Sequence, residues 1–328
     1  MTSLDKLYTE LENQIKDGLF KQAAATARKI LDTLEPGQND EMACAAWAFL
    51  LKGLERMSQE DEIDECIEKY PGGKFSRCIP FLAAFKQKIP DTGYMIDGVF
   101  HRGYWDGHGE FVHCSSRDRV RRLQILAAAI PDAENCPDPV IRGRFFYNLA
   151  NLLLQNRRQS QAYRLQAKTD LTVLPDYNLR DDLDSSISRA PVNPDGTPVF
   201  YSVPVSFDAA VNDGERFRYA AARAEAAGNA DAALLYADFL RELFDFAAVS
   251  DTFFWYRDPE KCERLYQLKD NESIAELADG IRKITLPPDS VYLDIYRRYG
   301  YHEHCATIYM ARMQYERAAE EFRLAREK

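Results

Sequence analysis

The chain has 328 residues, of which 46% are hydrophobic and 29% are charged. This balance is typical of a soluble globular protein large enough for two domains or one elongated solenoid, and it excludes extensive disorder. The net charge of −10 argues against binding of the whole protein to nucleic acid or anionic lipid, because both need clustered positive charge.

Two further features of the whole chain narrow the class of protein. No window approaches 18 uninterrupted apolar residues, and the first residues lack the apolar core of a signal peptide. The sequence as given therefore predicts neither a secretion signal nor direct membrane insertion. The seven cysteines are an odd number without C-x-x-C spacing, so we expect buried thiols rather than a disulfide framework or a zinc knuckle.

Residues 1–88 form the first expected segment, a set of amphipathic helical hairpins. One helix is expected over residues 4–16, and the Asp17-Gly18 break separates it from a second helix. Apolar residues line one face of this second helix: Phe20, Ala23, Ala27 and Ile30. Small residues next to an aromatic fit a tetratricopeptide turn, in which two helices approach closely. Further helices are expected at about residues 41–54, 60–68 and 75–88.

Residues 89–170 are expected to combine a small β-hairpin insert with arginine-rich helices. Asp97-Gly98 lies between short apolar runs, which is the strongest local signal for a hairpin turn. Ser115 and Asp118 have the S-x-x-D spacing of a helix start, and the apolar periodicity behind them predicts a helix that ends at Pro131. Two more helices are expected over residues 142–155 and 159–169.

The stretch from His101 to Leu165 is basic inside an acidic chain. It holds ten arginines, no lysine and six acidic residues, so its net charge is +4. Arginine offers a rigid fork of donors to carboxylates, and ion pairing with the acidic stretch at residues 176–184 is one interpretation. The alternative is a site for an anion or a protein partner. Its candidate residues are Arg117, Arg119, Arg121 and Arg122, together with Tyr104 and Trp105 of a glycine-rich loop.

A group of histidines and one cysteine in the same region raises the alternative of a metal-dependent enzyme. Its members are His101, His108, His113 and Cys114. Four nitrogen and sulfur ligands suffice for tetrahedral zinc, but H-x6-H-x4-H-C is not a zinc-ligand spacing. His302 and His304 lack the i, i+4 spacing of H-E-x-x-H, and no phosphate-binding or nucleophile-elbow motif is present. The sequence therefore predicts no cofactor and no enzymatic activity.

Residues 171–213 are expected to form a long, proline-rich connector, and residues 214–328 a second set of helical hairpins. The connector has little helical periodicity and contains an Asp195-Gly196 turn, although residues 199–203 also fit a short strand. Helical apolar spacing resumes after it in two sets of residues: Leu235, Phe239, Leu243 and Phe246, and then Ile274, Leu277, Ile281 and Ile284.

The last expected helix carries the spacing Y-x-x-A-x-x-x-F-x-x-A over residues 315–325, which is typical of the second helix of a tetratricopeptide hairpin. A repeat helix cannot bury its apolar face alone, so we expect at least one further helix after Lys328 in the complete protein. The predicted fold class is mainly α. It is a tetratricopeptide-like helical-hairpin solenoid with the β-hairpin insert and the irregular connector.

Several stretches, taken in order, resemble the N-terminal helical region of very large bacterial alpha-2-macroglobulin-like proteins. They are residues 93–103 (GYMIDGVFHRG), 117–121 (RDRVR), 143–150 (GRFFYNLA), 170–177 (DLTVLPDY), 190–201 (APVNPDGTPVFY) and 212–216 (NDGER). In that family the region precedes β-sandwich domains and a thioester domain, whose reactive bond joins the Cys and Gln of a C-x-x-Q motif. None of the cysteines here is followed by Gln at the third position.

The resemblance implies a segment of an exported, protease-inhibitor-like protein, periplasmic or surface-anchored, in which this region serves as an adaptor or spacer. We therefore expect a non-enzymatic scaffold that binds a protein partner, or further domains of the same chain, through a groove near the arginine-rich centre. A freestanding cytosolic repeat adaptor and the metal-dependent enzyme are the alternatives.

Overall fold

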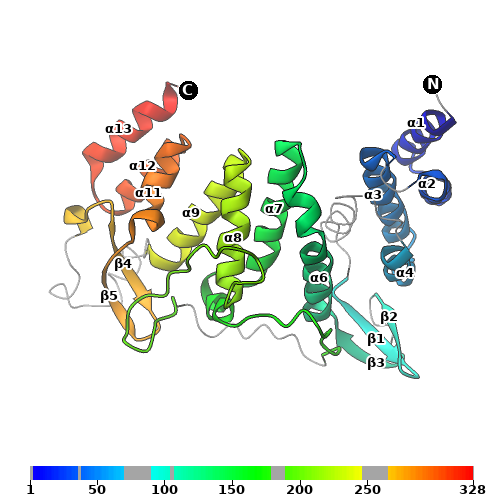
Figure 1. Cartoon of the computed structure of the whole chain (residues 1–328), viewed down its shortest axis with the longest axis horizontal. Coiled ribbons are helices and arrows are strands. Elements are labelled where there is room, and N and C mark those ends of the chain that lie inside the picture. The colour runs from blue at the N-terminus through cyan, green and yellow to red at the C-terminus, as the bar shows by residue number, and fades with distance from the viewer. Residues whose placement is uncertain are drawn as a thin grey trace. The chain divides into compact units, whose positions relative to one another are not determined.

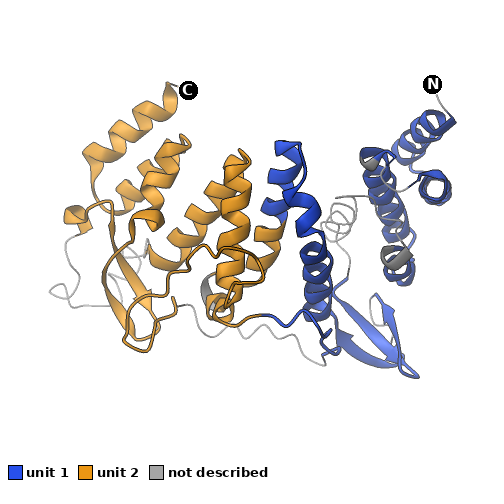
Figure 2. Ribbon diagram, viewed as in Figure 1, with its two compact units in different colours: residues 1–148, 169–183 blue, residues 149–168, 184–328 orange. Residues whose placement is uncertain are grey.

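The structure is a computed structural model that describes residues 3–35, 38–69, 90–103, 107–178, 189–245 and 265–327. These residues are mainly helical with small antiparallel sheets, which confirms the predicted fold class at that level (Figure 1). The chain separates into two compact units, coloured in Figure 2. Unit 1 contains residues 1–148 and 169–183, and unit 2 contains residues 149–168 and 184–328. The division into four segments stays a prediction.

Unit 1 begins with four helices that pack in chain order. They are α1 (Ser3–Lys16), α2 (Phe20–Thr33), α3 (Asp40–Arg56) and α4 (Asp61–Lys69). Their shared core is apolar, with Ile30, Trp47, Leu50 and Leu51 almost fully buried. Gly53 of α3 lies against α2, where an added Cβ would be 3.2 Å from the Phe20 carbonyl oxygen. The helix expected at residues 75–88 lies outside the described residues.

A three-stranded antiparallel sheet follows in unit 1, in the order β2-β1-β3. Its strands are β1 (Thr92–Ile96), β2 (Val99–Arg102) and β3 (Glu110–His113). Asp97 and Gly98 join β1 to β2 with φ angles of 50° and 79°, as a two-residue hairpin turn of this kind requires. The β-hairpin predicted at Asp97-Gly98 is therefore confirmed.

The arginine-rich helices are α6 (Ser115–Glu134) and α7 (Pro139–Leu154), the second of which continues into unit 2 after residue 148. The expected end of α6 at Pro131 is wrong, because the helix runs through that proline to Glu134. Pro131 removes one backbone donor, but Ile130 and Ala133 on either side of it are buried and keep the last turn in place. Cys114, not Ser115, is the residue before the helix, and its side chain makes no capping hydrogen bond.

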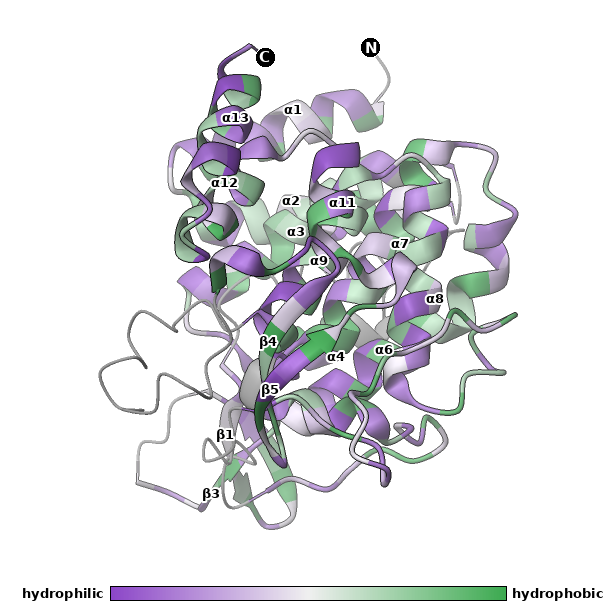
Figure 3. Cartoon of the chain, turned by 90° about the vertical axis from the view of Figure 1, so that its left-hand side faces the viewer, coloured by the Kyte–Doolittle hydropathy of each residue, from purple (hydrophilic) through white to green (hydrophobic). Residues whose placement is uncertain are grey.

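Unit 2 contains a 3-10 segment, η1 (Gln159–Gln166), where an α-helix was expected, and then a series of α-helices. These are α8 (Asp213–Ala226), α9 (Ala230–Phe244), α11 (Tyr292–Arg298), α12 (His302–Ala311) and α13 (Tyr315–Arg326). Successive members pack on one another, with α11 lying against α9. Hydrophilic and hydrophobic residues lie side by side on α12 and α13 in the colouring of Figure 3.

The helix expected around Ile274, Leu277, Ile281 and Ile284 is wrong. These residues form a β-hairpin of β4 (Glu272–Leu277) and β5 (Gly280–Thr285), paired from Glu272↔Thr285 to Leu277↔Gly280. Short η2 (Leu265–Gln267) and η3 (Pro288–Ser290) segments precede and follow it. Isoleucine is β-branched and favours strands, and this preference outweighs the helical spacing on both sides of the Ala278-Asp279 turn.

The described part of the connector in unit 2, residues 189–212, contains no helix and no strand, and the short strand considered at residues 199–203 is absent from it. Isolated bridges hold it instead: Ala190 pairs with Leu277, and Val192 pairs with Pro198. Tyr201 is buried, and its ring packs on the first turn of α8 at Gly214. The predicted irregular connector is confirmed over this stretch.

The same backbone corner recurs between consecutive helices. One residue at each corner has a left-handed φ: Gly18, Ser58, Gly228, Gly300 and Met313. The amide of the residue after it donates to the carbonyl five residues back, with N···O distances of 2.8 to 3.0 Å. This is the hydrogen bond of a Schellman motif, which ends one helix and lets the next begin almost at once. Whether these hairpins form a solenoid stays a prediction.

None of the helices in the described ranges combines the length and apolar character that a membrane crossing requires.

We predict that Gly214→Ala destabilises the protein by about 1–3 kcal/mol, the usual cost of overpacking. The new Cβ would lie 2.3 Å from ring carbons of the buried Tyr201. Gly53→Ala is the matched control, because its nearest contact is 3.2 Å and a helix interior gains up to about 1 kcal/mol from Ala over Gly. Calorimetric melting of both variants checks this, and an equal or larger loss for Gly53→Ala would contradict it.

Candidate functional site

The four arginines predicted to bind a partner lie on α6, and the structure divides them by exposure. Arg119 and Arg122 are each only 7% exposed, whereas Arg117 and Arg121 are half-buried. Burial lowers the pKa of Arg122 to about 10, and its Nε donates to the Asp118 carbonyl oxygen at 3.2 Å. Only Arg117 and Arg121 therefore have side chains within reach of a partner.

Side chains of α6 hold residues 169–178, a segment of unit 1 that we call the strap. Arg117 Nη1 donates to the Pro175 carbonyl oxygen at 2.6 Å, and Gln124 Nε2 donates to the Leu171 carbonyl oxygen at 3.0 Å. Arg119 Nη1 donates to the Thr169 hydroxyl at 3.2 Å. Two of these three contacts involve the backbone of the strap, so they do not depend on its side chains.

The strap ends at an aromatic contact that we call the ring slot, made by Phe100 and Arg117 around Tyr177. The rings of Phe100 and Tyr177 are stacked, with centroids 4.3 Å apart and an interplanar angle of 17°. The Arg117 guanidinium carbon lies 4.8 Å from the centre of the Tyr177 ring, within cation–π distance. Burial raises the pKa of the Tyr177 hydroxyl.

Backbone pairing continues from the ring slot to the edge of the sheet. The amide of His113 donates to the Asn178 carbonyl oxygen at 2.6 Å, and the amide of Asn178 donates back at 3.1 Å. Asn178 thus pairs with β3 as an isolated antiparallel bridge. Gly93 of β1 leaves the space that the Phe100 ring occupies, because an added Cβ would lie 2.5 Å from that ring.

A buried ion pair joins the sheet to α6 behind the ring slot. Arg102, at the end of β2, donates to both carboxylate oxygens of Asp118 at 2.8 and 2.9 Å, and both residues are buried. The same guanidinium donates to both oxygens of Asp64 on α4 and to the Pro90 carbonyl oxygen. Asp118, expected to cap the helix, instead anchors Arg102.

The sequence hypothesis of a metal site depended on four residues that the structure keeps in separate surroundings. His101 on β2 lies 3.2 Å from Asp61, His113 makes an edge contact with the Phe111 ring, and His108 is exposed in the loop between β2 and β3. Cys114 is buried 3.1 Å from Arg102, and burial raises its pKa, which opposes the thiolate that zinc binds. Over the described ranges, no group of three or more potential ligands is close enough to hold a metal. Tyr104 and Trp105 lie outside those ranges.

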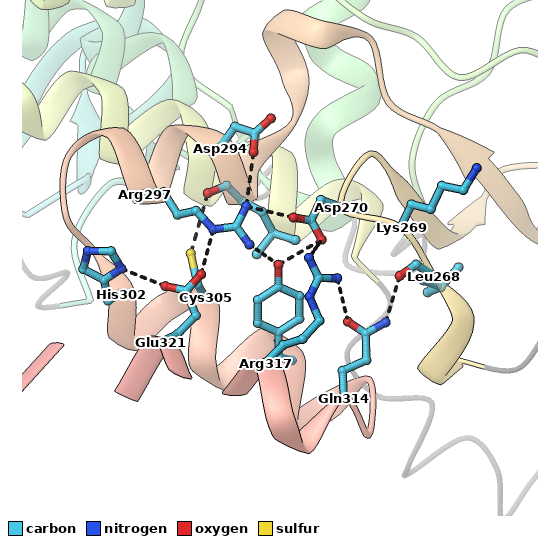
Figure 4. Close-up of polar contacts among 12 residues, drawn as sticks. Leu268, Lys269, Asp270, Asp294, Arg297, His302, Cys305, Gln314, Arg317 and Glu321 are labelled. Atoms are coloured by element: carbon cyan, nitrogen blue, oxygen red, sulfur yellow. Dashed lines mark hydrogen bonds and ion pairs between the residues drawn. The ribbon is translucent and has the colours of Figure 1, made fainter. Parts of the chain in front are cut away.

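Sequence reasoning missed a polar network in unit 2 that centres on Arg297 of α11. Figure 4 shows this side chain between Glu321 of α13 and Asp270 of the loop before β4. Its Nε donates to Glu321 at 2.7 Å and its Nη1 to Asp270 at 2.8 Å, and it also contacts the Tyr309 hydroxyl. Burial opposes the charge of Arg297, but these carboxylates outweigh it and raise the pKa.

The network extends from the start of α13 to its middle. His302 Nδ1 lies 2.7 Å from Glu321, which is only 5% exposed, and Gln314 Nε2 donates to the Leu268 carbonyl oxygen at 2.8 Å (Figure 4). The helix therefore cannot leave α11 and α12 without exposing several paired charges. Two residues of the repeat-like pattern remain on its surface, Tyr315 at 59% exposure and Phe322 at 42%.

No protein-family model, curated protein or solved structure matches the chain.

We predict that Arg102→Met destabilises the protein by about 3–5 kcal/mol, because it leaves the buried Asp118 carboxylate without its partner. The double variant Arg102→Met with Asp118→Leu should recover much of that loss, since it removes both buried charges, while the carboxylate of Asp64 is 42% exposed and stays in contact with water. Thermal melting of the full chain measures both effects. A single variant as stable as the double would contradict the assigned pair.

We predict a pH dependence that arises from Asp270. Burial raises its pKa, but hydrogen bonds from Arg297 and Tyr309 and the charge of Arg317 outweigh burial and hold the pKa below its ordinary value. The stabilisation is therefore present above the pKa of the unfolded state and is lost as the pH falls through the lowered folded value.

Asp270→Asn should accordingly cost about 1–3 kcal/mol at pH 7, and the difference from the unmodified protein should shrink as the pH falls below about 4. Asp294→Asn is the control. Its carboxylate also contacts Arg297 but is 57% exposed, so it should cost under about 1 kcal/mol. Melting curves from pH 7 to pH 3 test this, and a gap that widens in acid would contradict it.

Proposed function

We propose that this chain is a non-enzymatic helical interaction and scaffold segment of a larger exported protein of the alpha-2-macroglobulin-like, protease-inhibitor-like class. Its partner is a protein or further domains of the same chain. The class and the extracytoplasmic location rest on the sequence resemblance. The recurring helix corner is the structural observation that carries the scaffold role.

That corner supports a scaffold for a geometric reason. Each one ends a helix and starts the next within a few residues, so the two helices that it joins pack on each other. Chains built in this way present long surfaces whose shape depends on local contacts only. Partner binding is the usual use of such a surface.

The charged clusters also support a structural role for their members. Arg102 is saturated by Asp118, Asp64 and a carbonyl oxygen, and Arg297 is surrounded by Asp270 and Glu321. Guanidinium groups held in this way join elements that are distant in sequence. We assign the partner-facing role to the half-buried Arg117 and Arg121, and a structural role to the buried Arg119 and Arg122.

The polypeptide encoded after Lys328 is the probe that tests this proposal. We expect the gene to continue into β-sandwich domains, and the separately produced downstream polypeptide to bind this chain in isothermal titration. Arg121→Glu should weaken that binding about tenfold without lowering the melting temperature, since the side chain is accessible. Arg144→Glu on the exposed face of α7 is the charge-matched control.

Two results would overturn the proposal: a gene that stops directly after Lys328, or a downstream polypeptide without β-sandwich domains. Arg122→Glu is not a suitable probe of binding, because it introduces a carboxylate at a buried position beside Asp118 and should unfold unit 1.

A further inference from the structure

We propose that the surface formed by α6, the β3 edge and the ring slot binds an extended peptide that carries an aromatic residue. The strap, residues 169–178, is then an internal ligand that occupies this surface. This inference rests on the proposed function and names the kind of segment that its protein partner presents.

The first argument is that the surface recognises backbone. Arg117 and Gln124 donate to strap carbonyl oxygens, and His113 pairs with both backbone groups of Asn178. Every peptide in an extended conformation offers these same groups. Pairing with an exposed strand edge is a common way in which proteins bind peptides, and the main chain supplies the affinity.

The second argument is that the ring slot supplies selectivity. Tyr177 is the strap side chain that both stacks on Phe100 and lies within cation–π distance of Arg117. Aromatic rings held between a ring and a guanidinium are typical anchors of protein interfaces. The slot is also fixed in advance, because Gly93 leaves room for Phe100, and Arg102 fixes the end of β2.

The third argument is that the strap is lightly held apart from these contacts. Thr172, Val173 and Asp176 are exposed, Val173 by 63%. The other apolar residues of the strap are half-buried and none lies in the buried core of unit 1, so its local opening costs less than unfolding of that unit. A partner segment can therefore replace it, and its apparent dissociation constant is the intrinsic one divided by the fraction of molecules in which the strap is open.

The ring slot defines the partner further. Asp170 of the strap accepts hydrogen bonds from the Thr172 amide and hydroxyl, within the strap itself. The segment that fits best is therefore extended, with a tyrosine or phenylalanine at the position that contacts Phe100 and Arg117.

The test uses the full chain and a fluorescein-labelled peptide of residues 169–178. Tyr177→Ala in the protein weakens the internal strap, so this variant should bind the peptide about tenfold more tightly than the unmodified protein does in fluorescence anisotropy. Adding Arg117→Gln should abolish that gain, whereas adding Arg144→Gln should not. A peptide with alanine in place of its tyrosine should bind at least about tenfold more weakly.

A second measurement needs no variant. Saturating peptide should accelerate hydrogen exchange of the strap amides in the unmodified protein, while the His113 amide stays protected by the incoming peptide. Unchanged exchange in the strap, or equal binding by the unmodified protein and a folded Tyr177→Ala variant, would overturn the inference. If the downstream polypeptide still binds Arg117→Gln normally, this inference fails while the proposed function stands.

Discussion

The bidentate ion pair between Arg102 and Asp118 is the interaction on which unit 1 depends. Both charges are buried, so the pair is favourable only when the guanidinium makes both hydrogen bonds to the carboxylate with good geometry. That requirement fixes the end of β2 relative to the first turn of α6. Phe100 lies two residues before Arg102 on the same face of the strand, and Arg117 directly precedes Asp118, so the same pair also positions both walls of the ring slot.

In unit 2, another arginine fixes the positions of separate elements relative to one another. Arg297 contacts Asp270, Glu321 and Tyr309, which come from a loop, from α13 and from α12. The planar guanidinium presents several donors at separate positions, so it can bond partners on several sides. A lysine ammonium is a compact point charge and could not reach all three partners. Apart from the exposed Asp294, which lies three residues before Arg297, the charged and hydroxyl partners of the two arginines lie between 12 and 38 residues away. The buried Arg102 of unit 1 and the half-buried Arg297 of unit 2 therefore both fix elements that the chain brings together only on folding.

The separation in sequence between interacting residues explains which features could be predicted from the sequence. The Asp97-Gly98 hairpin depends on two adjacent residues with positive φ, and the break at Gly18 depends on one, so local reasoning found both. The hairpin at Ile274 to Ile284 was mistaken for a helix, because its apolar residues recur at the three- and four-residue spacing of a helical face, although β-branched residues and the Asp279-Gly280 pair favoured strands. In the candidate site, the identity of the α6 arginines was predicted, but their partners were not. Burial of Arg119 and Arg122 depends on elements that are distant in the sequence.

The arginine-rich centre shows why counting charges does not reveal their use. An excess of arginine predicts carboxylate partners, yet the contacts from α6 to the strap go to carbonyl oxygens, a hydroxyl and a ring. Carbonyl oxygens and rings satisfy the donors of a guanidinium without neutralising its charge. The strap is thus held through its backbone and one aromatic ring, which a segment of another sequence can also offer. A partner peptide competes with the strap by repeating these contacts, and its apparent affinity depends on how often the strap opens.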